Sequence, residues 1–534
     1  MASFQDLPMP HAFKIWEGVH TIACSRLWAI VLLLILLPGT IAICGVTEQP
    51  EPTPEPVPAI PSPPPPLPEQ ILSPIPRQFD WMRREVRPNP ALEAVLGLQE
   101  VTPRLLMTIS LSEEYSDNFF LEERDREEEY RTRLTIGTVY RLESGRSFVS
   151  LANSLSGTYD ARAEEGNFAF ANLALNVGHQ LPRLSLALSE SFIRSDEVEE
   201  ARPRGIRRER RTFTTNTVSP QVRYDLTPRT ALTGTYTNTL VWNENGERRN
   251  GEIAADDQSR IQGDSVSHAF STGLQHQFSR NLIGSGNYTF TIIDSEQEAD
   301  TVSHGVAAAF GYIINPRTST SLRAFGTIVD RRDGATGGNR GGIGEEDSNI
   351  YGLSLGVRRQ LTTFLAAFVS VGPTVVSRED RPTRVFAAWQ ASLDGRLPLT
   401  RHSSLSFSTQ QSITDTAGDI DDVGLVLSQS ATAILNYTVL RNLFASVFAN
   451  YTRTELLEDI ATNVPTQDRE FTSWSIGATL SYALTPVWSL SVRYQYQRRD
   501  SDVPAEATFD GTRLGGSFDE NRVIFSLTAA FPIF

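Results

Sequence analysis

Residues 473–497, SWSIGATLSYALTPVWSLSVRYQYQ, contain two runs in which apolar and polar side chains alternate. The first run extends from Trp474 to Leu484 and the second from Trp488 to Gln497. A period of two is typical of a β-strand that has one apolar face and one polar face. Because only Thr485-Pro486-Val487 separates the two runs, we expect them to form an antiparallel hairpin.

The same alternation recurs from Pro103 to Phe534, with two kinds of interruption that follow each other along the chain. Some are short, such as Thr227-Pro228-Arg229, and others are long and polar, such as Asn243 to Asp264. Short turns at one rim and long loops at the other are typical of outer-membrane barrels. The pattern predicts an all-β fold, a single transmembrane antiparallel up-and-down β-barrel of about twenty strands, with about eighteen as the alternative count. An even count places both ends of the barrel on the periplasmic side.

Composition excludes several other classes of protein. The chain has 534 residues, a net charge of -15 and a mean hydropathy of -0.24, and 40% of its residues are hydrophobic. A bundle of membrane helices would need several apolar runs of about twenty residues each. A barrel needs much less apolar sequence, because half of each strand faces a wet lumen. The acidic balance also argues against nucleic acid as a partner, since binding to phosphates needs a basic patch.

The first 44 residues are typical of a secretory signal peptide. An apolar run from Leu27 to Leu37 is too short to span a membrane comfortably, and small residues follow it. Cleavage after Ala42 or Cys44, acylation of Cys44 as in a lipoprotein, and an uncleaved inner-membrane anchor are the alternatives. Cys24 and Cys44 are the only cysteines of the sequence, so we expect no thiol chemistry and no disulfide in the remainder of the chain.

Two segments separate the signal from the barrel. Residues 45–76 are rich in proline, which fixes φ and removes hydrogen-bond donors, so we expect a disordered, extended periplasmic linker. It would act as a tether, or as a docking strip for a periplasmic partner. Residues 77–102 contain an apolar patch from Ala91 to Leu98 and predict a short helix, placed either as a plug in the barrel mouth or against the rim. Residues 103–534 form the predicted barrel.

Charged residues fall on the polar faces of the predicted strands. An arginine that faced lipid would cost about 2–4 kcal/mol at mid-depth, so we expect these side chains to face the lumen. They would either brace the wall through pairs with carboxylates or form a constriction that attracts an acidic solute or polymer. The candidates are Arg131, Arg133, Arg141, Arg223, Arg323, Arg358, Arg396, Arg493, Asp225 and Asp394.

Motifs for catalysis, cofactors and metals are not found in the sequence. The long loops are rich in carboxylates, as in residues 122–129, but they lack the calcium-loop pattern, so we predict a solvated rim and no metal site. Five histidines, His179, His268, His276, His304 and His402, are scattered and have no nucleophile motif beside them. We therefore predict that the protein is not an enzyme and has no cofactor.

One stretch resembles a known family. Ser112-Glu113-Glu114-Tyr115-Ser116-Asp117-Asn118-Phe119-Phe120 is similar to the first strand of porin-2 type outer-membrane β-barrels and of barrels associated with exopolysaccharide and exosortase systems. The resemblance implies an envelope role linked to polysaccharide, and no catalytic residues carry over from it. One departure is at the end of the chain, where Phe534 falls on the opposite face to Phe531 and Ile533. A bulge at Pro532 would restore the aromatic end that barrel assembly usually requires.

From these observations we predict a passive pore or conduit in the outer membrane of a Gram-negative bacterium, linked to surface or exopolysaccharide secretion. The alternative is a non-conducting structural or adhesive barrel. The predicted partners are outer-membrane lipid, lipopolysaccharide, the barrel-assembly machinery, and polysaccharide or periplasmic secretion components.

Overall fold

The computed structural model of the chain describes residues 105–119, 121, 123, 126–161, 166–195, 212–243, 264–295, 300–332, 347–378, 381–396, 403–415, 425–457, 470–502, 508–509, 512–513 and 516–533. Its strands are β1 (Leu105–Ser116), β2 (Glu129–Ser144), β3 (Ser147–Asp160), β4 (Gly166–Gln180), β5 (Leu184–Ser195), β6 (Phe213–Thr227), β7 (Thr230–Asn243), β8 (Ser265–Gln277), β9 (Leu282–Ser295), β10 (Asp300–Asn315), β11 (Thr318–Arg332), β12 (Ser348–Thr362), β13 (Leu365–Arg378), β14 (Arg381–Arg396), β15 (Ser403–Asp415), β16 (Leu425–Leu440), β17 (Leu443–Leu456), β18 (Glu470–Ala483), β19 (Trp488–Ser501), β20 (Thr508–Phe509), β21 (Thr512–Arg513) and β22 (Phe518–Pro532).

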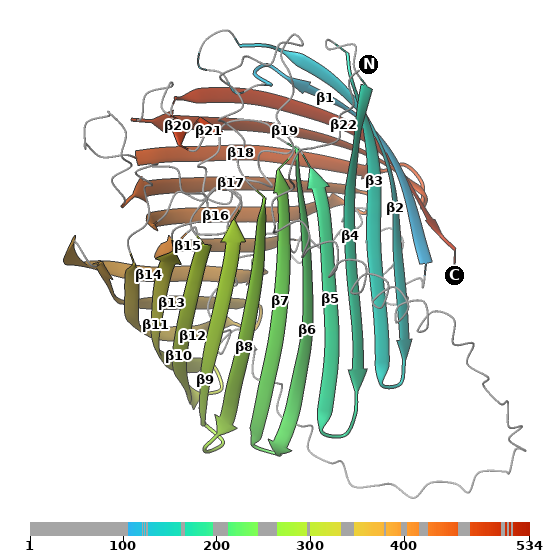
Figure 1. Cartoon of the computed structure of the whole chain (residues 1–534). Helices are drawn as coiled ribbons and strands as arrows, with labels where there is room; N and C mark the ends of the chain where they lie inside the picture. Colours follow the sequence, from blue (N-terminus) through green and yellow to red (C-terminus); the bar gives the residue numbers. More distant parts are fainter. Residues whose placement is uncertain are drawn as a thin grey trace, which may run out of the picture. The chain divides into compact units, whose positions relative to one another are not determined.

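Hydrogen bonds join each long strand to its neighbours in the sequence, and β19 pairs with β22. The last strand, β22, then pairs with β1 and closes a barrel of 20 antiparallel strands, while β20 and β21 form a small separate hairpin. In Figure 1 the strands at the front, such as β5 to β8, cross those behind them, β16 to β19, as tilted strands of a barrel do. The predicted fold class and the predicted count of about twenty strands are confirmed.

Large apolar side chains lie exposed on one face of the long strands. Leu155 is 58% exposed, Leu355 55% and Val371 55%, and each shares its face with further apolar residues two positions away. Aromatic residues occur near both ends of this face, as Tyr130 and Tyr140 do on β2. An apolar outer belt with aromatic rims is the surface that a barrel presents to lipid. The apolar residues of the alternating pattern therefore cover the outside of the barrel.

Tight turns join the strands at one rim. Ser144 pairs with Ser147, so that only Gly145 and Arg146 form the turn between β2 and β3. Gly145 has a φ of 53°, the left-handed conformation that a two-residue hairpin turn requires and that glycine adopts without strain. The hairpin predicted at residues 473–497 is likewise present as β18 and β19, in register from Phe471 with Ser501 to Ala483 with Ser489.

The last strand corrects one sequence-based expectation. The register between β1 and β22 continues without a shift to the pair of Leu106 with Pro532, so the bulge expected at Pro532 is not present in the paired part of the strand. Phe534 lies outside the described residues, and so do the segments predicted as signal peptide, proline-rich linker and short helix or plug. Among the described residues, no helix is long and apolar enough to cross a membrane.

The belt makes a testable prediction. Leu355→Arg places a charge on the outer face between Leu322 and Val371, and we expect it to lower the free energy of unfolding by about 2–4 kcal/mol. Ser370→Arg, on the opposite face of the neighbouring strand β13, is the control and should have little effect. Urea unfolding in lipid vesicles measures both variants, and equal losses would contradict the assignment of faces.

Candidate functional site

The alternation of side chains along each strand shows whether a predicted lumen residue lies on the inner or the outer face of the barrel. Arg131, Arg133 and Arg141 alternate along β2 with the exposed Leu134 and Ile136, so their side chains occupy the inner face. The same parity puts the following residues on inner faces: Arg223, Asp225, Arg323, Arg358, Asp394 and Arg493. Arg396 ends β14, and its side chain lies outside the described set. Whether these residues act on a solute stays a prediction.

Buried charges concentrate where the barrel closes. We give the name charged seam to the buried and partly buried ionisable residues on the inner face of β19, β22, β1, β2 and β3, which are Arg493, Arg499, Glu520, Arg522, Glu114, Glu129, Arg131, Arg133 and Asp160. Arg131 binds Asp160 through Nε at 2.6 Å, and both side chains are less than a tenth exposed. Arg522 binds Glu114 at the same distance and is equally buried. These two pairs tie β2 to β3 and β22 to β1.

Aromatic rings cover the arginines of the charged seam. The guanidinium of Arg131 lies 4.6 Å from the ring centre of Phe119, and that of Arg499 lies 4.6 Å from the ring centre of Phe471. Arg493 donates to Gln495 at 2.6 Å and lies 5.2 Å from the ring centre of Phe448. Contacts of a cation with the face of a ring stabilise a desolvated charge more than an exposed one. The charged seam is therefore a packed part of the wall and not a free row of cations.

Three residues on each side hold the first and last strands together. We call Ser116, Asp117 and Asn118 with Asp519, Glu520 and Asn521 the closing clasp. Ser116 donates to Glu520 at 2.5 Å, and Asn118 donates to the backbone oxygen of Asp519 at 2.9 Å. The carboxylate of Asp117 accepts both the backbone N–H and the side-chain N–H of Asn521 at 2.7 Å. The stretch that resembles porin-2 type barrels thus contains one side of the closing clasp, Ser116 to Asn118.

The first long loop turns inward beyond the clasp. Phe119 lies on the inner-face residue Arg131, and Leu121 packs against Phe518 with both side chains buried. Leu121 adopts a φ of 60°, which is unusual for a branched side chain, and its N–H donates to Asn118 at 3.1 Å. The loop is also held by Arg126, which pairs with Asp519. Phe119 and Leu121 therefore cover part of the inner face beside the charged seam.

Hydroxyl groups line the wall across from the charged seam. We call the inner faces of β5 to β18 the hydroxyl wall, from the serines and threonines that alternate there with the outer belt. Several bond across strands, as Ser219 does with Thr237 at 2.9 Å and Thr217 with Thr239 at 3.3 Å. Some charges on this wall are open to the lumen; Arg223 pairs with Asp225 at 3.2 Å, and both side chains are about half exposed.

The described histidines of the barrel occupy the outer face. Each has a hydroxyl partner at 2.8 Å, and the pairs are Ser147 with His179, Thr230 with His276, Tyr236 with His268, and Tyr288 with His304. His402 lies outside the described residues. In the same described part of the chain, no group of three or more His, Cys, Asp or Glu side chains is arranged to hold a metal ion. The hydroxyl–imidazole pairs therefore face the surroundings of the barrel and not its lumen.

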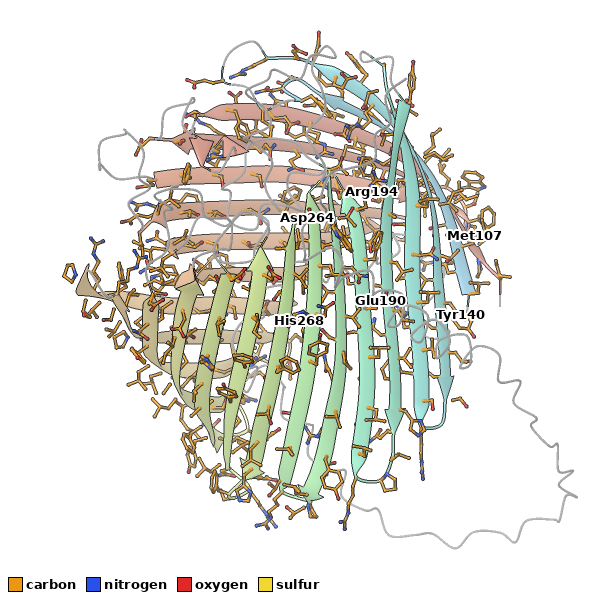
Figure 2. The ribbon with its side chains drawn as sticks, in the orientation of Figure 1. Met107, Tyr140, Glu190, Arg194, Asp264 and His268 are labelled. Carbon is orange, nitrogen blue, oxygen red and sulfur yellow. The ribbon has the colours of Figure 1, made fainter. Side chains whose placement is uncertain are left out.

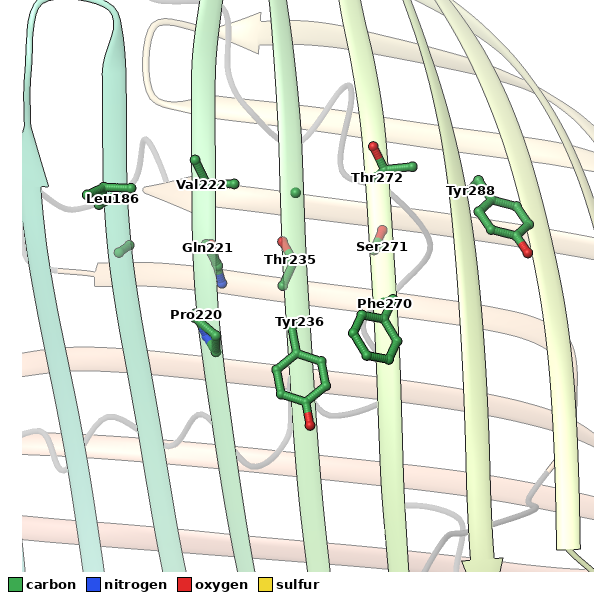
Figure 3. Close-up of a pocket in the computed structure, with 12 residues that line it drawn as sticks. Leu186, Pro220, Gln221, Val222, Thr235, Tyr236, Phe270, Ser271, Thr272 and Tyr288 are labelled. Atoms are coloured by element: carbon green, nitrogen blue, oxygen red, sulfur yellow. The ribbon is translucent and has the colours of Figure 1, made fainter. Parts of the chain in front are cut away.

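A shallow groove of about 680 Å³ runs over β5 to β9 (Figure 3). Its walls include Leu186, Val222, Tyr236, Phe270 and Tyr288, which belong to the outer belt. Gly234 and Thr272 are small enough to leave the depression between them. Because the groove is open to the lipid side, it is not part of the path through the barrel.

Glu190 interrupts the outer belt on β5. It shares a face with Leu186 and Leu188, and the register places it between Leu175 on β4 and Val218 on β6 (Figure 2). Four residues further along the same face is Arg194. A carboxylate in such surroundings is disfavoured, although less strongly than an arginine. Sequence reasoning did not single out this residue, but its parity with Leu186 and Leu188 is visible in the sequence.

Comparisons with known proteins agree with this architecture. Residues 344–521, one third of the chain, match the family model described as "Putative beta-barrel porin 2". This chain is a porin-like barrel of the outer-membrane type. The resemblance to porin-2 type barrels is thereby confirmed, and it now rests on β12 to β22, because Ser112–Phe120 lies outside the matched segment.

Several solved structures are similar to this chain at low identity. OpdQ of Pseudomonas aeruginosa is 13% identical, with 80% of this chain and 99% of that one covered and a TM-score of 0.37. OccAB2 of Acinetobacter baumannii is 13% identical, with 80% and 98% covered and a TM-score of 0.38. Such a likeness says nothing about a solute. No curated protein matches the sequence.

The charged seam predicts a contrast between two ion pairs. Arg131→Ala leaves Asp160 buried without its guanidinium, and we expect the free energy of unfolding to fall by about 3–5 kcal/mol. Arg223→Ala, which breaks the half-exposed pair with Asp225, should change it by no more than about 1 kcal/mol. Double-mutant cycles on both pairs, in urea and lipid vesicles, measure the couplings, and similar values would refute the contrast.

Removal of the charge at Glu190 should increase stability, whereas removal of the charge at Arg131 should decrease it. We expect Glu190→Leu to raise the free energy of unfolding by about 1 kcal/mol, because it removes a carboxylate from the apolar outer face. The matched control is Asp394→Leu on the inner face of β14, where the carboxylate accepts a hydrogen bond from Ser406 at 2.7 Å. The control should lose stability. A loss in both variants would show that Glu190 does not face lipid.

Proposed function

We propose that the protein is a passive channel for polar solutes across the outer membrane. The observation that carries this proposal is the hydroxyl wall, which offers both donors and acceptors along the lumen. The hydrogen bonds that such a wall forms with water and those that it forms with a hydroxylated solute differ little in free energy. The strong charges of the charged seam are paired and covered, so they do not trap a passing molecule.

A weak preference for anions follows from the open charges of the lumen. Arg141 is exposed on the inner face near the turn that follows β2. Arg323 lies on the inner face of β11, with its guanidinium 5.8 Å from the ring centre of Phe325. Arg141 and the half-exposed Arg223 are far less enclosed than Arg131 and Arg499 of the charged seam, and an exposed cation in a pore raises the local concentration of anions.

The finer part of the proposal is a role in the export of surface polysaccharide. Hydroxyl groups along the wall are chemically suited to a chain of sugar units, and the first strand resembles that of barrels associated with exopolysaccharide systems. In this arrangement residues 45–76 extend into the periplasm as a tether, and outer-membrane lipid and lipopolysaccharide surround the belt. A non-conducting structural or adhesive barrel is the outcome that the next experiment would reveal.

Planar-bilayer recording tests the channel. Purified, folded protein should give discrete conductance steps, and the combined change Arg141→Gln, Arg223→Gln and Arg323→Gln should move the reversal potential in a KCl gradient toward potassium selectivity. Arg498→Gln is the control, because Arg498 lies on the outer face beside Asp500 and should leave the reversal potential unchanged. The complete absence of steps would rule out the channel, and reversible block by added oligosaccharides would support the link to polysaccharide.

A further inference from the structure

One seam of the barrel is joined along only part of its length. The ladder between β14 and β15 has eight residue pairs, from Arg396 with Ser404 to Trp389 with Gln411. The ladders on either side, β13–β14 and β15–β16, have thirteen pairs each. Arg381–Ala388 of β14 and Ser412–Asp415 of β15 therefore lack ladder partners across this seam among the described residues. We call these two segments the open seam, and it lies in the half of the barrel nearer the long loops.

Side chains replace the backbone ladder where it stops. Gln411 is the last residue of β15 in the ladder, and its Nε2 donates to the backbone oxygen of Ala387 at 2.5 Å. Gln429 on β16 in turn donates to Oε1 of Gln411 at 2.8 Å. Gln411 shares the outer face with Trp389, so this pair of amides lies on the outside of the wall. Side-chain bonds of this kind can exchange with other partners without unfolding a strand.

Apolar side chains from both sides of the open seam meet in one cluster. Ile350, Val376 and Leu425 are buried at its centre, and Phe386 from β14 and Ile413 from β15 pack against it. The cluster contrasts with the serines and threonines of the hydroxyl wall. In Figure 1 the hairpin of β13 and β14 extends beyond the neighbouring strands at this place. The wall is thus held here by apolar contacts, which another apolar group can replace.

We propose that the open seam is a lateral exit, through which the alkyl tail of an amphipathic solute passes from the lumen into the outer leaflet of the membrane. The polar head of such a molecule would remain with the hydroxyl wall or the amides of Gln411 and Gln429, and the tail would replace contacts in the cluster of Phe386 and Ile413. A barrel that only conducts along its axis needs no such opening, because unpaired backbone groups beside lipid are costly. This function goes beyond axial passage of polar solutes.

A disulfide across the open seam tests the exit. Continuing the register of the ladder places Ala388 opposite Ser412, so Ala388→Cys with Ser412→Cys would lock the seam. The control is Ser392→Cys with Ser408→Cys, which are paired within the ladder already. Both are made in the full chain with Cys24 and Cys44 replaced by serine. The readouts are extraction of a fluorescent dodecyl sulfonate from loaded proteoliposomes by external albumin, and conductance in planar bilayers.

We expect the oxidised lock to slow extraction at least about tenfold, a barrier change of ~1.4 kcal/mol, with recovery on reduction and unchanged conductance. The control pair should alter neither readout. Equal extraction rates with and without the lock, verified by gel mobility, would overturn the exit, as would a wild-type rate equal to that of empty vesicles. The two proposals fail in different measurements. If the protein is not a channel, the bilayers show no conductance steps, whereas the extraction experiment still tests the exit.

A second variant does not depend on disulfide formation. Phe386→Asn removes an apolar side chain from the cluster at the open seam and should slow extraction while conductance is unchanged. Phe368→Asn is the control, because Phe368 lies on the inner face of β13 beside Gly356 and away from that cluster. If both variants slow extraction equally, the cluster has no particular part in the exit.

A bismaleimide linker between Ala388→Cys and Ser412→Cys can replace the disulfide as the lock.

Discussion

Backbone N–H and C=O groups are costly to leave unpaired beside lipid, and the closed form of the sheet depends on that constraint. A sheet satisfies it only if its two edges meet, which here means that β22 must find β1. The ladder itself provides backbone hydrogen bonds at alternate closing pairs, but any two strand edges could form such bonds. The closing clasp and the buried ion pair of Glu114 with Arg522 supply the specificity, because they fit only this pair of edges in this register.

Charged residues are distributed unevenly over the inner face of the barrel. Buried arginines such as Arg131 and Arg522 are tolerated at the charged seam because carboxylates and aromatic rings take the place of water around them. Concentrating these groups beside the closing strands leaves the remaining wall to serines and threonines. The inner face therefore has two parts. The charged seam stabilises the closing strands, and the hydroxyl wall lines the remainder of the lumen.

Much of this arrangement could be predicted from the sequence, and the limits have a physical origin. Because the period of a strand is two, the face of Arg133 or Asp225 follows from its neighbours alone. The partner of Glu114 does not, because Arg522 belongs to a strand at the other end of the chain and only closure brings them together. Likewise Ser112–Phe120 was informative as a resemblance, while its contact with Asp519–Asn521 required the structure. The open seam was not recognised from the sequence, although Pro382 in β14 and the outer-face Gln411 in β15 interrupt the alternation at this place.

The closing clasp also has a kinetic consequence. It joins residues 404 positions apart, and closing a free loop of that length would cost ~5 kcal/mol of chain entropy. The cost becomes small once the intervening hairpins have formed, because the ends of the sheet are then already near each other. Contacts of such separation form slowly, and until they form the first strand has an unpaired edge. Barrel formation should thus proceed hairpin by hairpin and be completed by a single late step, so that a chain truncated before Asp519 would remain an open sheet.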